Sequence, residues 1–202
     1  MKVDIQDVLF WMDAIRNSDD KYRTLESFWK GQVNSKVWLA TELYNLIPKS
    51  KQNSIVIYGG WNGVLASILF NSRLPLDSIT SVDIDPVCED IANTVNRLYV
   101  DQSKFTAITA DMTTVIDESA DVVINTSCEH ITQEQYDKWL NNQPNNATIV
   151  LQSNNYFNLD EHIRCSTDLE DFVCMSNINP YLRKTLETLK YDRYMLIGKK
   201  NV

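Results

Sequence analysis

The chain has 202 residues, of which 44% are apolar and 23% charged, enough for one hydrophobic core, so we expect a single domain over residues 1–202. The net charge of −8 argues against a general nucleic-acid binder, and no apolar run reaches the length that a membrane helix needs. The four cysteines lack CxxC spacing, which indicates reduced thiols in a cytoplasmic protein. His162-x-x-Cys165 has the spacing of two metal ligands, but no further ligands at motif spacing accompany it, so we expect no metal site.

The first 50 residues predict a helical N-terminal segment. Acids interrupt the apolar residues at the start of the chain, so this part reads as a helix over about 4–17 and not as a signal peptide. A second helix is expected over about 35–47, ended by Pro48. The apolar positions of the first helix fall on one face, which we expect to be buried: Ile5, Val8, Leu9, Met12 and Ile15.

Aromatic and basic side chains lie between these two helices. From Lys21 to Lys51 there are six basic and two acidic residues, whereas from Asp77 to Asp121 there are ten acidic and two basic residues. We expect residues 1–50 to form a lid over a ligand cleft, with substrate contacts from Tyr22, Arg23 and Trp29. The alternative to a lid is that the segment packs on the flank of the sheet. The alternative explanation of the uneven charge is that the basic and acidic stretches are simply two solvated faces of opposite sign.

From residue 53 onward, strand and helix patterns alternate. The runs "SITSVDI" and "DVVIN" are β-branched and almost continuously apolar, as parallel strands covered on both faces should be. This alternation predicts a doubly wound α/β sheet, and "RKTLETLKYDRYMLIGKK" predicts an antiparallel hairpin that completes it, with a turn at Tyr191-Asp192. The expected elements are strands 55–58, 79–84, 105–109, 120–125 and 147–152, and helices 63–71, 86–99 and 132–141.

Small and polar residues follow each predicted strand, where a doubly wound sheet binds its ligands. The glycines of GGWNG (59–63) follow the first strand and let backbone approach a ligand closely. Asp83 ends the second strand, where a carboxylate can accept both hydroxyls of a ribose. Asp85-Pro86 instead has the pattern of a helix cap followed by the first helical position.

The later strand ends carry further polar groups. Asp111 follows the third strand, where a carboxylate can accept from an exocyclic amine or simply form a turn. "NTSCEHI" (125–131) follows the fourth strand and would face a reacting group, and "QSNNYF" (152–157) follows the fifth.

The set "IVIYGGWNG…SVDIDP…TADM…VVINTSCEHI", roughly residues 53–157 together with the closing hairpin, resembles the class I S-adenosylmethionine-dependent methyltransferases, in particular small phage-type members. The resemblance implies a Rossmann-like, mostly parallel seven-stranded sheet, a cofactor-binding core over 53–202 and S-adenosyl-L-methionine as cofactor. It places Gly59, Gly60, Trp61 and Gly63 at the methionine half, Asp83 at the ribose, Asp111 and Met112 at the adenine and Asn125 near the sulfonium, with Tyr58 and Ile84 flanking these motifs.

Two positions depart from the family pattern. Ile57 stands where the family usually has an acid, and Trp61 stands where the middle glycine of the loop is expected. Trp61 could meet the cationic sulfonium through its ring, or it could be a packing residue on the first turn of the helix.

Methyl transfer mainly requires a positioned nucleophile and, where needed, a base. Glu129 and His130 are the candidate catalytic residues, although "EH" could equally cap the next helix and pack. Asn154 and Tyr156 are further candidates for substrate contacts. The segment "SNNYF" that contains them lacks the Pro-Pro-Tyr pattern of amino-group DNA methyltransferases, so that substrate class is not directly supported.

The substrate expected from this reading is a small molecule or a side chain of a partner protein. Two rival functions stay open: an aminopropyl-type transferase that uses the same cofactor, and a non-catalytic cofactor-binding or scaffold protein. The oligomeric state is open as well, and a phage-encoded chain would work in the cytoplasm of its host.

Overall fold

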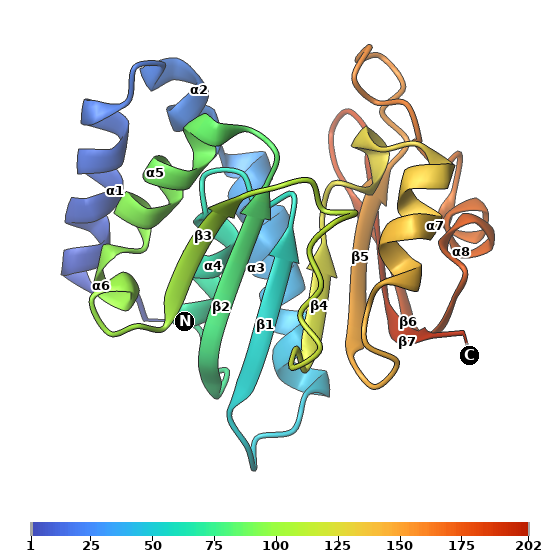
Figure 1. Ribbon diagram of the computed structural model, residues 1–202. Helices are drawn as coiled ribbons and strands as arrows, with labels where there is room; N and C mark the ends of the chain where they lie inside the picture. The colour runs from blue at the N-terminus through green and yellow to red at the C-terminus, as the bar shows by residue number, and fades with distance from the viewer. Residues whose placement is uncertain (1, 202) are drawn as a thin grey trace. The chain divides into compact units, whose positions relative to one another are not determined.

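The computed structural model describes residues 2–201 (Figure 1), which divide into two compact units with a boundary between Asp111 and Met112. The N-terminal helices and the first strands of the expected core at 53–202 both belong to the first unit. Over the described residues, no helix combines the length and the apolarity needed to cross a bilayer.

The first unit holds three parallel strands in the order β3-β2-β1. Ile55 lies opposite Ile79, and Asp83 lies opposite Thr109, so the carboxyl ends of the strands share one edge. The strands are β1 (Asn53–Tyr58), β2 (Leu76–Asp83) and β3 (Phe105–Thr109).

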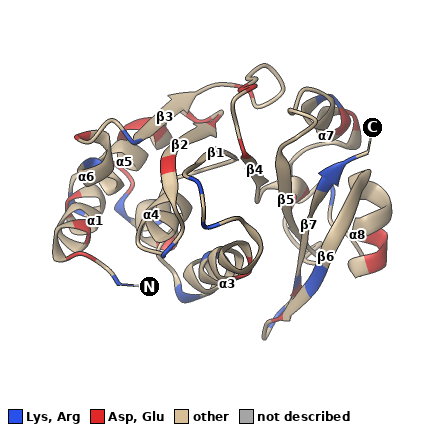
Figure 2. Cartoon of the chain, turned by 90° about the horizontal axis from the view of Figure 1, so that it is seen from below, with Lys and Arg blue, Asp and Glu red and all other residues tan. Residues whose placement is uncertain are grey.

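Six helices accompany these strands in the described part of the first unit. α3 packs against α4, and both lie on the same side of β1 and β2 (Figure 2), whereas α1 packs against α5. The helices are α1 (Ile5–Asn17), α2 (Lys21–Glu26), α3 (Lys30–Leu46), α4 (Val64–Phe70), α5 (Pro86–Val95) and α6 (Arg97–Val100).

The expected orientation of α1 is wrong. Ile5, Leu9 and Met12 are more than half exposed, whereas Asp7 and Ala14 are buried. Ala14 packs with Ile91 and Val95 of α5, and Trp11 lies beside them. The helix turns this face inward because α5 covers it and because polar partners, Asn71 and Tyr99, hold the Asp7 carboxylate inside the unit.

The second unit holds four strands in the order β4-β5-β7-β6. β4 and β5 are parallel, and β7 runs antiparallel to both β5 and β6, with Asn154 opposite Arg193. Tyr136, Trp139 and Phe172 fill its core. Its elements are β4 (Val122–Asn125), the 3-10 turn η1 (Cys128–His130), α7 (Gln133–Asn141), β5 (Thr148–Asn154), α8 (Leu169–Ser176), β6 (Ile178–Glu187) and β7 (Asp192–Lys200).

The fold class expected from the sequence is confirmed: seven mostly parallel strands, a C-terminal antiparallel hairpin and N-terminal helices. The local differences are small. The long helix expected over 86–99 ends at Val95, and a separate short helix follows after Asn96. The hairpin turn lies just before Asp192, which begins β7, and α2 and α8 were not expected.

Candidate functional site

The loop between β1 and α4 is built from residues in the left-handed backbone region. Gly59 has φ of 64°, Trp61 of 49° and Gly63 of 71°. Glycine adopts this region without strain, but a bulky residue such as Trp61 is a genuine outlier there. The position where a glycine was expected thus has a glycine-like backbone although it carries an indole.

Two glycines of this loop, Gly60 and Gly63, lie directly against neighbouring elements. A Cβ on Gly60 would meet Ser81 Oγ of β2 at 1.9 Å, and one on Gly63 would meet the Ala92 Cα of α5 at 3.0 Å. The Gly60 N–H also donates to the Val82 carbonyl at 3.1 Å. The loop is therefore fixed close to β2 by contacts that leave no room for side chains.

Asp83 ends β2 beside this loop and is half-buried. Its Oδ2 accepts a hydrogen bond from the Trp61 N–H at 2.8 Å, and its Oδ1 accepts from the Asp85 N–H at 3.1 Å. The predicted ribose ligand and the predicted cofactor loop are thus joined by a hydrogen bond.

Asp85 is the N-cap of α5, as predicted, with Pro86 at the first helical position. Its Oδ1 accepts from the Val87 N–H at 3.0 Å, and this bond lowers the pKa of Asp85, with a further contribution from Arg23. Arg23 Nη2 lies 2.6 Å from the other carboxylate oxygen. Arg23, predicted as a substrate contact, is therefore paired with a carboxylate of its own unit.

Asn62 is a residue of the loop that the sequence reading did not include among the site residues. Its side chain is buried, and neither its Nδ2 nor its Oδ1 has a hydrogen-bond partner among the described residues. A buried amide left unpaired costs free energy, so such groups are normally satisfied by water or by a ligand. The available signal was its position, as the one polar side chain in GGWNG.

The other predicted residues of the first unit differ in exposure. Tyr58 is fully buried at the end of β1, whereas Ile84 is 72% exposed directly after Asp83. Tyr22 and Trp29 are also mostly exposed, and Asp111 is exposed at the end of the unit. The ligand roles assigned to all of these residues stay predictions.

The end of β4 in the second unit carries Asn125, which is fully buried. Its Oδ1 accepts from the Ser127 N–H at 2.9 Å, and its Nδ2 points to Met112 Sδ at 3.6 Å. The structure thus brings Asn125 and Met112 together, as two members of the predicted cofactor set.

Glu129 lies in a buried network and is only 3% exposed. Its Oε1 accepts from Asn154 Nδ2 at 2.6 Å and pairs with Arg193 Nη1 at 3.5 Å. Arg193 also donates to the Thr126 carbonyl and to Gln152 Oε1. The predicted catalytic Glu129 and the predicted substrate contact Asn154 are therefore adjacent, and Arg193, which the sequence reading missed, joins them.

His130 is exposed, and its Nδ1 lies 3.2 Å from the Glu161 carbonyl. The Tyr156 N–H donates to Asn154 Oδ1 at 2.8 Å, which fixes the chain after β5. The ring of Tyr156 lies near the rings of His162 and Tyr191. The catalytic role of His130 and the substrate role of Tyr156 stay predictions.

The cysteines of the described chain are free thiols. Burial raises the pKa of Cys88 and of Cys128 to about 12 and that of Cys165 to about 11. These three side chains therefore remain protonated and weakly nucleophilic near neutral pH.

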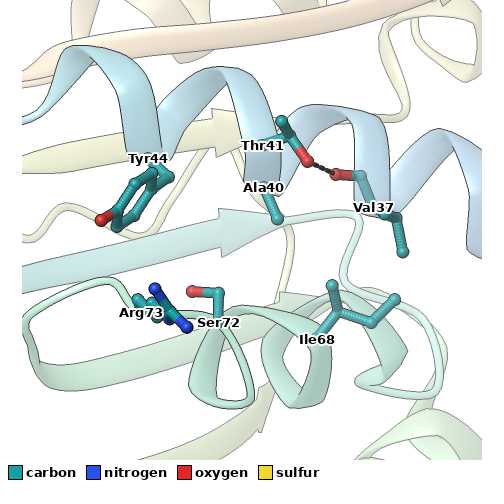
Figure 3. A pocket seen from close by; sticks show the side chains of 7 residues that line it. All are labelled: Val37, Ala40, Thr41, Tyr44, Ile68, Ser72 and Arg73. Atoms are coloured by element: carbon teal, nitrogen blue, oxygen red, sulfur yellow. Dashed lines mark hydrogen bonds between the residues drawn. The ribbon is translucent and has the colours of Figure 1, made fainter. Parts of the chain in front are cut away.

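A pocket of about 260 Å³ lies between α3 and the last turn of α4 (Figure 3). Because α4 starts beside the loop at the carboxyl edge, its last turn lies toward the other end of the strands. This pocket is therefore separate from the loop of residues 59–63. Its lining is mostly apolar: Val37, Ala40, Thr41, Tyr44, Ile68, Ser72 and Arg73.

No protein-family model and no curated protein matches this sequence. Solved structures do match it. Magnesium protoporphyrin IX methyltransferase (ChlM) from Synechocystis PCC 6803, with bound SAH, is 10% identical with a TM-score of 0.68, covering 98% of this chain and 95% of that one. The chain shares the fold of this methyltransferase.

Two further methyltransferases extend the comparison. Geranyl diphosphate C-methyltransferase from Streptomyces coelicolor A3(2), in complex with Mg²⁺, geranyl diphosphate and S-adenosyl-L-homocysteine, is 7% identical with a TM-score of 0.62, over 92% of this chain and 87% of that one. Mitomycin 7-O-methyltransferase MmcR is 15% identical with a TM-score of 0.62, over 94% of this chain and 60% of that one. At these identities the likeness concerns the fold.

Proposed function

We propose that this chain binds S-adenosyl-L-methionine through its first unit and transfers the methyl group to a small molecule or to a side chain of a partner protein. Two kinds of support exist: the methyltransferase fold shared with structures that contain SAH, and the strand-end residues of the first unit. The observation that carries the proposal is Asp83, a half-buried carboxylate at the end of β2 held beside a loop of left-handed residues.

The residues of the loop fit the polar groups of this cofactor. Each oxygen of Asp83 accepts one backbone N–H, and a carboxylate oxygen can accept about two hydrogen bonds. One acceptor position per oxygen therefore remains for the two hydroxyls of a ribose. The unpaired amide of Asn62 offers a donor and an acceptor for an amino-acid group.

When bound, the cofactor supplies an electrophilic methyl group on a cationic sulfur. The contribution of this chain is to bind and orient the reactants and to accept a proton where the nucleophile carries one. His130 suits the proton-accepting role better than Glu129, because its ring is exposed while Glu129 is buried against Arg193. Trp61 would add a ring face for the cation.

Calorimetric titration of the purified chain with SAM, SAH and NAD tests the cofactor. We expect saturable binding of SAM and SAH and none of NAD, because the loop lacks G-x-G-x-x-G spacing. Asp83→Asn should weaken SAH binding by about tenfold or more, since a charge-assisted hydrogen bond contributes about 1.5–3 kcal/mol.

Asp85→Asn is the matched control for Asp83→Asn. It changes a carboxylate two residues away that caps α5 and pairs with Arg23, so we expect lower thermal stability but nearly unchanged SAH affinity. Equal losses of affinity in both variants would contradict the assignment of Asp83. Binding of NAD without any response to SAH would overturn the cofactor itself.

We also propose that the part of the N-terminal segment around α2 covers the end of β2. The Arg23–Asp85 pair ties α2 to the start of α5, while Tyr22 and Trp29 stay exposed and available for a substrate. Hydrogen exchange with and without SAH tests this. Ligand-dependent protection across 18–36 is expected, together with protection at 59–63; protection at 59–63 alone would mean that the segment is only a flank.

The same proposal includes two finer assignments, a small phage-type methyltransferase and a cytoplasmic location. They are supported by the quoted motifs and by the free thiols. Product analysis separates the rival functions. A methylated product with release of SAH supports the proposal, whereas transfer of an aminopropyl group, or tight SAM binding without turnover of any offered acceptor, would favour the rivals.

A further inference from the structure

We propose that Glu129, His130 and His162 form a binding site for a divalent transition-metal ion such as Zn²⁺. All three residues belong to the second unit, and one potential ligand atom from each lies within 4.8 Å of those of the other two. The inference does not depend on the methyl transfer proposed above, but a His130 that binds the ion through Nε2 cannot also accept a proton there.

The carboxylate of Glu129 is prepared for a further ligand. Its Oε1 is held by Asn154 and Arg193, but its Oε2 is buried without a hydrogen-bond partner in the described part of the chain. A buried carboxylate oxygen without a partner is costly, and a cation satisfies it directly. The hydrogen bonds to Oε1 also fix the orientation of the group, as outer partners do around metal ligands.

The two imidazoles each present one nitrogen for an ion. His130 Nδ1 faces the Glu161 carbonyl at 3.2 Å, and His162 Nδ1 faces the Tyr156 carbonyl at 2.7 Å. Because a carbonyl oxygen only accepts, each Nδ1 donates its N–H there, and in the neutral imidazole Nε2 is then the nitrogen with the lone pair that can bind a metal. Backbone carbonyls are common partners of the second nitrogen of a metal-binding histidine.

The spacing fits a site that closes around its ion. The ring centroids of His130 and His162 lie 4.8 Å apart at 81°. Donor atoms at Zn²⁺ distances in a tetrahedral site lie about 3.4 Å apart. Ligand atoms that are up to 4.8 Å apart therefore need to approach one another by up to about 1.4 Å. Of the three ligands only His130 is exposed, so we expect its ring to make this movement.

The ligand types select the class of ion. Two imidazole nitrogens and one carboxylate oxygen suit Zn²⁺ and its first-row neighbours, whereas Mg²⁺ and Ca²⁺ prefer oxygen ligands. Three protein ligands leave at least one coordination position for water or a substrate atom. Cys165 Sγ lies on the protonated side of His162, 3.7 Å from Nδ1, and is not counted as a ligand.

The test uses the full chain without a polyhistidine tag, freed of metal with EDTA and titrated calorimetrically with ZnCl₂ or MgCl₂. We expect one Zn²⁺ per chain, a rise of the melting temperature with Zn²⁺, and no comparable response to Mg²⁺. Co²⁺ should give a visible absorption spectrum that Zn²⁺ abolishes. A wild-type chain without saturable Zn²⁺ binding would overturn the proposal.

The variants His130→Ala and His162→Ala locate the site. Each should weaken Zn²⁺ binding by about tenfold or more, because each removes a ligand. Circular dichroism and melting in EDTA show whether each variant remains folded; His130→Ala, at an exposed position, keeps the test valid should His162→Ala not fold. Glu134→Gln, at an exposed position on α7, is the control and should bind like wild type. Unchanged binding in His130→Ala, or an equal loss in Glu134→Gln, would exclude this site.

Discussion

The carboxyl ends of β1 and β2 and the carboxyl ends of β4 and β5 are built in different ways. The first region depends on backbone: three left-handed residues, Gly59, Trp61 and Gly63, and a carboxylate that accepts from backbone N–H groups. The second depends on buried side chains, with Glu129 and Arg193 at its centre. The first region should therefore be sensitive to added side-chain volume, and the second to the loss of a charge.

The largest effect is expected in the second region. Arg193→Met leaves the buried Glu129 without its cation, and breaking a buried ion pair from one side costs about 3–5 kcal/mol of unfolding free energy. Chemical denaturation monitored by circular dichroism measures the loss. Arg183→Met on the neighbouring β6 is the control, because its pair with Glu170 is exposed and such pairs contribute about 0–1 kcal/mol. Similar losses in the two variants would contradict the charge dependence.

A smaller effect is expected from added volume in the first region. Gly63→Ala puts a Cβ at 2.9 Å from Ala92 Cβ on a residue with φ of 71°, and such strain costs about 1–3 kcal/mol. Gly31→Ala is the matched control, since Gly31 is exposed in the first turn of α3 and a Cβ there would meet Trp29 Cδ1 at 3.9 Å, an ordinary van der Waals contact. We expect Gly31→Ala to raise the free energy of unfolding by about 0.4–1 kcal/mol, whereas Gly63→Ala should lower it. A stabilised Gly63→Ala variant would break the comparison.

The smallest effect concerns Asp7, a buried carboxylate that accepts hydrogen bonds from Asn71 and Tyr99. Burial raises the pKa of Asp7, although Asn71 and Tyr99 donate hydrogen bonds to it. The folded chain therefore binds this proton more tightly than the unfolded chain, so the contribution of Asp7 is greatest below a pH of about 3.8 and is lost as the pH rises through the raised pKa.

Asp7→Asn tests this dependence, because it removes the titration. Relative to this variant, the wild-type chain should lose melting temperature as the pH rises from 4 to 7. Asp13→Asn, at an exposed position on the same helix, is the control for an Asp-to-Asn substitution outside the core. If the melting temperature of the wild-type chain instead rose relative to that of Asp7→Asn with increasing pH, the hydrogen bonds would lower the pKa of Asp7 by more than burial raises it.

Much of the fold could be predicted because its signals are local. The uniformly apolar β-branched run that ends at Asn125 has few alternatives to a covered parallel strand, and Asp85-Pro86 caps and starts α5 through a hydrogen bond to a residue two positions away. A turn at 59–63 was likewise expected from its glycines, whereas the left-handed backbone of Trp61 was not.

The parts that were missed depend on distant partners. Glu129 and Arg193 are 64 residues apart, and their pairing follows from the antiparallel register of β7, which sequence patterns do not fix. The buried face of α1 was wrong for the same reason: its inward side is decided by α5 and by the partners of Asp7, whereas periodicity counts only apolar residues. The unpaired amide of Asn62 likewise appears only when its surroundings are known.

The burial of three of the four thiols has a practical consequence for spectroscopy. Cys88, Cys128 and Cys165 have pKa values raised to about 11 or 12, so reagents that attack thiolates should modify them slowly at neutral pH. Cys174 lies exposed on α8. A fluorophore or spin label can therefore be attached at this one helix of the natural sequence, without first removing any other cysteine.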